Sequence, residues 1–571
     1  MKRKTLTFLL IILANFTIGQ QKKFQINGAA RGYFLSNNLN LDESLDSVTT
    51  RKSNYGHTLL DLGFSLSPNS NTEVIGMFRI RNELGGFWGG GVTFDVRQLS
   101  LKGVAGNIVK YEIGDIDLKM TPYTLHNTLE EGVINEGDVF DLRREIVHYD
   151  MFYNDDNTWR MQGAKMNFGL EFGEFLREIN VKGFITRQRP TDGIVEPERL
   201  YGGGTIKIKQ SDNLTFGFNS VNVFDLSETI QDSIQYKNNV HTFDMLYTKD
   251  INKTTDIGMK SEAGISSTSY SNYNDNRAPE SIEDWFYDIA LVSHLKNKNL
   301  KIQLGYKDVG ADFLSSGAQT RRIDYSRFPG LYQQITNNAL GRPISYTDVI
   351  SGNTENSFKI SERLLPYFAG YNNMSPYGIA TPNRKGIYVN LLRTDSTKFK
   401  NSFINASFMT QSRGTGTNNK KQFILLKAGT DVYINDFFGW KKQLKVDLGL
   451  RYENTSRNGE DYEKGNLNST FIDAGISWEF AEKLDLLFGA KLWRVNGKAY
   501  VNERNQFNTV VNFDVVDYDF TENTYAAGMR YRFSDKNTLS VQYQIFDINH
   551  KTTNSINYGI SQFSFLYSLF F

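Results

Sequence analysis

Apolar and polar residues alternate along most of the chain with a period of two. In residues 444–452 every even position is apolar, whereas the odd positions hold Lys, Asp, Gly and Arg. Residues 484–492 repeat the pattern, with Asp485 and Lys491 among the odd positions. Because successive side chains leave opposite faces of a strand, each such segment predicts a β-strand with one apolar and one polar face.

The alternating segments predict an all-β fold of about 22 antiparallel strands, within a range of 18–26. An even number of strands places both ends of the chain on the same side of the membrane, the periplasmic one. The predicted strands begin near Phe24, His57, Thr72, Val92, Asn107, Trp159, Ile179, Tyr201, Leu214, Val240, Thr255, Trp285, Leu300, Gly386, Phe399, Gln422, Leu444, Phe471, Leu484, Tyr525, Leu539 and Tyr558.

The connections between these strands are sorted by length. Tight polar turns, such as 68–72 and 481–483, lie between longer polar loops, such as 187–199 and 454–467. A soluble β-sandwich shows the same alternation within its strands, but it has no reason to place short and long connections on opposite sides. The sorting favours a single transmembrane β-barrel.

The amino terminus has the pattern of an export signal. Three basic residues, Lys2, Arg3 and Lys4, precede an apolar run over 5–18 that is short for a membrane-spanning helix. We expect a signal peptide over 1–19 that is removed after Gly19, and a barrel over 20–571. An uncleaved amino-terminal anchor is the alternative.

At the carboxyl end, aromatic or apolar residues occupy every second position up to a terminal phenylalanine. Phe563, Phe565, Tyr567, Leu569 and Phe571 share one face of the last predicted strand. Here the chain resembles the large, porin-like and functionally unassigned outer-membrane β-barrels of Gram-negative bacteria, and the resemblance covers the chain after residue 19 as a pattern. It implies residence in the outer-membrane lipid and insertion by the barrel-assembly machinery, which reads the terminal aromatic strand. The alternative is the final buried strand of a secreted sandwich.

Two stretches interrupt the alternation, at 119–156 and at 310–385. The second holds five of the ten prolines, and proline removes a donor from a strand ladder. Its aromatic content argues against disorder, so we expect a folded loop that caps or enters the lumen; an exposed cap that packs only on other loops is the alternative. The candidate selectivity residues are Arg321, Arg322, Asp324, Tyr325, Arg327, Tyr332, Arg342, Tyr367, Tyr371 and Arg384.

Composition removes several classes of function. The chain has no cysteine, which excludes thiolate metal sites and cysteine nucleophiles, and its formal charge of +1 gives no electrostatic case for nucleic-acid binding. The six histidines are scattered, and neither HExxH nor GxSxG occurs. We therefore expect no catalytic residues, no resident cofactor and no metal site.

The charges on the predicted lumen faces are nearly balanced, which is typical of an ion-paired, hydrated interior.

These patterns predict a channel or transporter for polar solutes, narrowed or gated by the 310–385 loop. One alternative is a non-conducting scaffold whose external loops bind a secretion or surface partner, or a periplasmic one. A weaker alternative is an outer-membrane hydrolase.

Overall fold

The structure is a computed structural model. It describes residues 24–41, 52–84, 91–126, 135–140, 149, 161–173, 175–226, 234–271, 281–319, 360, 362–364, 367, 369–370, 372–394, 398–507, 509–551 and 557–571. The predicted signal peptide over 1–19 lies outside the described residues.

Twenty-two strands form one sheet. Their bounds are β1 (Phe24–Leu41), β2 (Lys52–Asn69), β3 (Thr72–Glu83), β4 (Val92–Ala105), β5 (Val109–Ile116), β6 (Met161–Glu171), β7 (Glu178–Arg189), β8 (Arg199–Lys209), β9 (Leu214–Asp225), β10 (Gln235–Asn252), β11 (Thr255–Ser271), β12 (Ser281–Leu295), β13 (Leu300–Val309), β14 (Arg384–Arg393), β15 (Phe399–Thr410), β16 (Gln422–Tyr433), β17 (Leu444–Arg457), β18 (Gly465–Ala481), β19 (Leu484–Arg504), β20 (Val510–Ser534), β21 (Asn537–His550) and β22 (Tyr558–Phe570).

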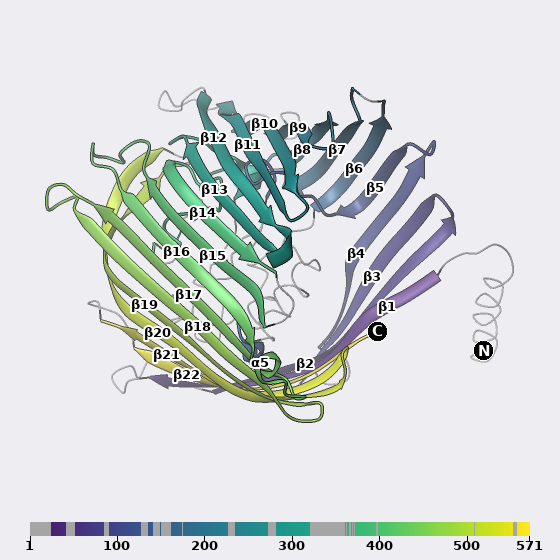
Figure 1. Ribbon diagram of the computed structural model, residues 1–571, viewed down its shortest axis with the longest axis vertical. Helices are drawn as coiled ribbons and strands as arrows, with labels where there is room; N and C mark the ends of the chain where they lie inside the picture. The colour runs from purple at the N-terminus through teal and green to yellow at the C-terminus, as the bar shows by residue number, and fades with distance from the viewer. Residues whose placement is uncertain are drawn as a thin grey trace.

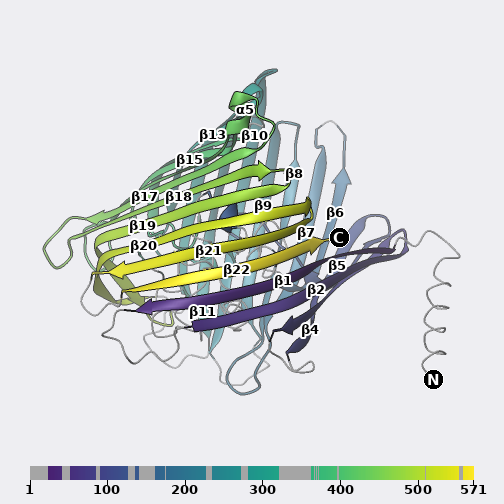
Figure 2. The ribbon, with the colours of Figure 1, turned by 90° about the horizontal axis from the view of Figure 1, so that it is seen from below.

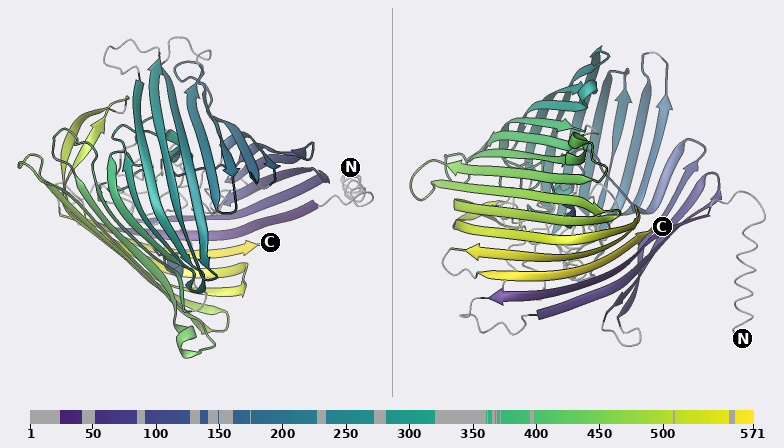
Figure 3. Two further views of the ribbon diagram at one scale, coloured as in Figure 1. Left: turned by 45° about the horizontal axis from the view of Figure 1, so that its top comes forward. Right: turned by 60° about the horizontal axis from the view of Figure 1, so that its bottom comes forward.

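The sheet closes on itself. Each strand pairs antiparallel with the next, and β22 returns to β1, with Phe570 opposite Ala29 and Tyr558 opposite Leu41. Figures 1 and 2 show the inclined strands running around one wall, and Figure 3 shows β22 beside the first strands. The expected all-β fold, a closed antiparallel barrel of 22 strands, is confirmed.

The two faces of the wall differ in polarity. On β17 the side chains of Leu448 and Leu450 are exposed, whereas those of Asp447 and Arg451 are buried on the inner side. Outward apolar side chains recur around the ring, so the outer surface is suited to lipid and the inner one to water and ion pairs. Examples are Phe94, Ile185, Phe243, Leu304, Phe408, Phe488 and Phe565.

Connections after even-numbered strands are mostly short, as between β2 and β3, whereas the longest connections, 117–160 and 310–383, follow odd-numbered strands. We call these two ends of the barrel the short-turn side and the long-loop side. A five-residue helix, α5 (Ile434–Phe438), lies in one connection on the short-turn side. In the described part of the chain, no helix combines the length and the apolarity that spanning a bilayer requires.

The largest error in the predicted strand starts is at β20, which begins at Val510 rather than near Tyr525. The additional residues continue the pairing with β19, so these two strands, of 21 and 25 residues, form the longest hairpin. A bilayer needs only about 9–11 residues per strand, and the hairpin therefore projects on the long-loop side. Its tip reaches β11, where Tyr270 donates a hydrogen bond to the Gln506 carbonyl at 3.2 Å and its ring packs against Phe507.

Candidate functional site

The connection between β5 and β6 contacts the inner wall at three separate sectors. At the first, the short helix η1 (Asp138–Phe140) lies against β17–β20. Asp138 accepts hydrogen bonds from Lys445 at 2.6 Å and from Arg530 at 2.9 Å. Burial opposes ionisation of this carboxyl, but the two cations outweigh it and hold the pKa of Asp138 well below its usual value. Glu136 adds an ion pair to Lys491 at 2.6 Å.

Glycines let the backbone of this segment approach the wall closely. A Cβ built on Gly137 would lie 2.7 Å from the Cα of Gly475 on β18, which no real side chain tolerates. Val139 and Phe140 are buried in a cluster with Leu487 and Ala526. The segment is therefore held by charge, by close backbone contact and by apolar burial together.

The second sector is formed by β2–β4 around one buried carboxylate, that of Asp61. Tyr149 of the loop donates to Asp61 at 2.6 Å, Arg79 pairs with it at 2.8 Å, and Arg97 pairs with it as well. Burial, and then the charge of Asp61, raise the pKa of the Tyr149 hydroxyl above its ordinary range. One acid thus joins the loop to three strands.

The third sector lies on β12, where Tyr123 stacks on Phe286 with ring centroids 3.9 Å apart and donates to Asp288 at 2.8 Å. Burial, and then Asp288, raise the pKa of the Tyr123 hydroxyl well above its usual value. The same stretch joins the β13–β14 loop, because the His126 N–H donates to the Gly317 carbonyl at 2.9 Å.

The described residues of the β13–β14 connection bridge distant parts of the wall. Glu362 pairs with Arg199 of β8 at 2.8 Å. Farther along, Asn373 donates to Thr455 of β17 at 2.9 Å. Since β8 and β17 are far apart in the ring, this loop crosses the lumen between them. The boundaries 119–156 and 310–385 themselves stay predictions.

Two of the candidate selectivity residues, Tyr367 and Arg384, line one cavity of about 640 Å³ on the long-loop side. Arg384 gives its guanidinium donors to the carbonyls of Met374 and Asn373 at 2.7 and 2.8 Å and lies over the Phe423 ring. Arg384 therefore holds the backbone of the loop in place at Asn373 and Met374. The other candidates lie outside the described residues: Arg321, Arg322, Asp324, Tyr325, Arg327, Tyr332, Arg342 and Tyr371.

The cavity on the long-loop side is also lined by charged residues that were not predicted from the sequence. Lys421, Glu503, Arg504 and Asp514 line it from β16, β19, β20 and their connections. Lys421 donates to the Tyr500 carbonyl at 2.5 Å. Its burial, and then the nearby cations of Arg457 and Arg384, lower the pKa of Lys421 to about 7.

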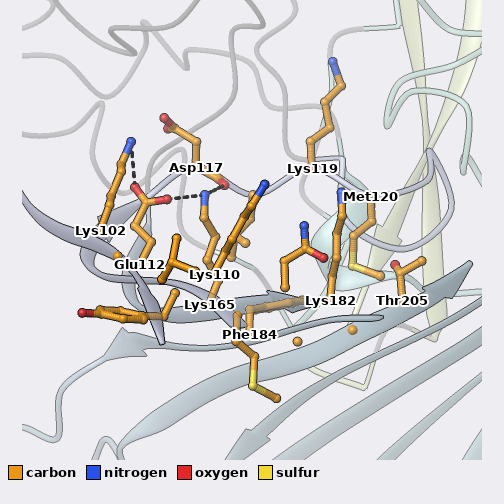
Figure 4. Close-up of a pocket in the computed structure, with 18 of the residues that line it drawn as sticks. Lys102, Lys110, Glu112, Asp117, Lys119, Met120, Lys165, Lys182, Phe184 and Thr205 are labelled. Carbon is orange, nitrogen blue, oxygen red and sulfur yellow. Dashed lines mark hydrogen bonds and ion pairs between the residues drawn. The ribbon is translucent and has the colours of Figure 1, made fainter. Parts of the chain in front are cut away.

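A second cavity, of about 680 Å³, lies on the short-turn side against β3–β9. We call it the lysine pocket, because its lining includes Lys102, Lys110, Lys119, Lys165, Lys182 and Lys207 beside the acids Glu73, Glu112 and Asp117. Figure 4 labels most of these side chains, with Phe184 on the wall and Met120 on the loop; the labelled ones are Lys102, Lys110, Lys119, Lys165, Lys182, Glu112 and Asp117. Sequence alternation could have found Lys182 and Lys207, since Ile185 and Ile206, at positions of opposite parity, face outward.

The described ranges contain no group of three or more His, Cys, Asp or Glu side chains placed to hold a metal ion.

No protein-family model and no curated protein matches this sequence. Among solved structures, the chain is similar to the copper transporter OprC at 9% identity, covering 96% of this chain and 80% of that one, with a TM-score of 0.47. It is also similar to OccK11 of Pseudomonas aeruginosa, at 9% identity, 96% coverage of both chains and a TM-score of 0.34. The PapC usher translocation pore matches at 8% identity, covering 96% and 99%, with a TM-score of 0.36. Identities and scores this low carry no argument about what this chain does. By its closed wall, apolar exterior and long connections, the fold is that of a porin-like outer-membrane β-barrel.

Proposed function

We propose that the protein is an outer-membrane channel or transporter for polar solutes, narrowed by the β13–β14 loop. The observation that carries the proposal is that two cavities with charged side chains in their lining lie inside one barrel, one on the long-loop side and one on the short-turn side. Each has the volume of a small-molecule site, roughly 300–1,000 Å³. Export through the predicted signal peptide over 1–19 belongs to the same proposal.

The arrangement of the loops supports a narrowed path. Segments of both long connections are fixed to the inner wall by ion pairs and buried rings, so they hold a defined position in the lumen. A solute that moves between the two cavities passes these segments and meets side chains that hydrogen-bond and carry charge. Apolar solutes would gain nothing there, whereas polar solutes replace part of their hydration shell.

The test is conductance in planar bilayers, comparing the wild type with a variant that lacks residues 311–382. The deletion can be closed by a short Gly-Ser linker, because the Asn383 N–H already donates to the Gly310 carbonyl at 2.9 Å. We expect pores from the wild type and a larger conductance from the deletion. As a control, replacing the exposed loop residues 192–195 by Gly and Ser leaves conductance unchanged.

Silence from both the wild type and the deletion variant would contradict the proposal. It would favour the non-conducting scaffold, whose external loops could then be tested by cross-linking in whole cells.

A further inference from the structure

We propose that the lysine pocket is a binding site for small organic anions with two or more negative charges, such as polycarboxylates or phosphate esters. This inference rests on the proposed function and specifies its substrate class. The sequence predicted a nearly balanced lumen, and near η1 the inner wall is indeed ion-paired. The lysine pocket departs from that balance, because the described residues that line it include six lysines and three acids, a formal charge of +3.

One of the carboxylates in the lining, that of Glu112, is shared between two lysines. Glu112 pairs with Lys102 at 3.3 Å and with Lys165 at 2.6 Å. Lys165 also donates to the Asp117 carbonyl at 3.1 Å. Two lysines therefore draw on a single carboxylate.

Three other lysines have no carboxylate at ion-pair distance within the described ranges: Lys110, Lys182 and Lys207. An ammonium group without a nearby counterion raises the local positive potential. That potential favours a mobile anion at this place over a neutral solute.

The strand register sets these three lysines close together. Asn167 on β6 stands opposite Lys110 on β5 and opposite Lys182 on β7. Because neighbouring strands are about 4.8 Å apart, the two lysine backbones lie roughly 10 Å from each other with an amide between them. Lys207 follows on β8, two positions beyond the partner of Lys182. This spacing suits an anion with two charged groups, which two flexible ammonium stems can approach at once.

The surroundings limit the size of the ligand. The wall contributes Phe184 and the loop contributes Met120 and Thr121, and the volume of about 680 Å³ fits a metabolite rather than a polymer. The β2–β3 turn residues Ser70 and Asn71 belong to the lining, which places the site toward the short-turn end of the lumen.

The experiment is isothermal titration calorimetry on the full-length barrel in detergent, with citrate, glucose 6-phosphate, acetate and glucose as probes. We expect citrate and glucose 6-phosphate to bind, acetate to bind more weakly and glucose to give no signal. The triple variant Lys110→Gln, Lys182→Gln and Lys207→Gln should weaken citrate binding by at least about tenfold, since each charged hydrogen bond is worth roughly that factor. The matched control, Lys253→Gln, Lys298→Gln and Lys536→Gln, removes the same charge from exposed turns and should bind citrate as the wild type does.

Folding is controlled by the triple Lys-to-Arg variant at 110, 182 and 207, which keeps the charge and should retain binding. Absence of citrate and glucose 6-phosphate binding in the wild type would overturn the inference, as would equal binding by the Gln triple variant. These outcomes are independent of conduction. If the protein forms pores but binds neither anion, the channel proposal holds and the anion site is refuted. If it binds citrate through these lysines but forms no pores, the anion site holds and the channel proposal is refuted.

Discussion

The carboxylate of Asp138 accepts a hydrogen bond from Lys445 at 2.6 Å, although 307 positions separate the two residues in the chain. The contact fastens a loop that leaves the wall after β5 to the inner face of β17. Arg530 of β20 holds the other carboxylate oxygen, at 2.9 Å. The position of the loop inside the lumen therefore depends on cations from a distant sector of the barrel.

The variant Asp138→Asn should release η1 from the wall. Removing one partner of a fully buried ion pair costs about 3–5 kcal/mol, because the other charge is left without a counterion. Here Lys445 retains Asp447 at 3.2 Å and Arg530 retains Asp485 at 3.1 Å. We therefore expect a smaller loss of stability, of about 1–3 kcal/mol. Because the chain has no cysteine, Val139→Cys gives a reporter without background. Its maleimide labelling should be slow alone and fast when combined with Asp138→Asn.

The control for this experiment is Asp192→Asn, combined with the same reporter. Asp192 accepts backbone hydrogen bonds within an exposed loop and touches no cation in the described ranges. Equal labelling rates for the two Asp variants would mean that the ion pairs do not hold η1.

The substitution Gly475→Ala should displace the same segment without changing any charge. A methyl group at this position collides with the backbone of Gly137, so either β18 or the loop has to move. We expect faster labelling of the Val139→Cys reporter and a destabilisation of about 1–3 kcal/mol from overpacking. Gly32→Ala is the matched control, because a Cβ there meets nothing within 4 Å. If the two glycine variants behave alike, the close contact is not required.

The strands were predictable because the alternation of apolar and polar residues within each segment is enough to indicate a strand. The predicted starts at Phe24, Leu214 and Leu444 coincide with β1, β9 and β17, where lipid on one side and water on the other enforce the alternation. The start of β20 was missed because its first part projects beyond the bilayer, where neither face is selected by lipid.

The interior contacts were not predictable in the same way. Nothing near Asp138 in the sequence indicates Lys445 or Arg530 as its partners, since the pairing depends on where the loop crosses the lumen. The inward direction of Lys182 was readable from alternation. That no carboxylate of the described residues lies at ion-pair distance from it depends on the neighbouring strands.

Lys421 should make the stability of the long-loop side depend on pH. Its folded pKa is about 7, because burial and two nearby cations disfavour the ammonium form, whereas an unperturbed lysine titrates near about 10.4. Between these values the unfolded chain binds more protons than the folded one, so stability rises with pH and is lost as pH falls through about 7.

The measurement is the temperature at which the barrel loses its folded mobility on a gel, taken from pH 6 to pH 9. We expect this temperature to rise with pH in the wild type, and Lys421→Met, which keeps the apolar stem, to flatten the rise. Lys420→Met, a change at the exposed neighbour, should leave the rise intact. A wild-type profile without slope over this range would show that Lys421 stays in one protonation state.

The terminal Phe571 combines a structural contact with the predicted assembly signal, and one substitution separates them. Its backbone exchanges two hydrogen bonds of 3.0 Å with Gly28, closing the barrel, while its side chain is 45% exposed on the outer face. Phe571→Ala keeps the backbone bonds, so refolding of the purified chain into detergent should be nearly unchanged. If the assembly machinery reads the terminal aromatic residue, the amount of folded barrel in the outer membrane of cells should fall markedly, and Phe571→Tyr should restore it.

Phe565→Ala removes another outward phenylalanine of β22 and serves as the control. Equal amounts of both alanine variants in the membrane would mean that the terminal position carries no special signal.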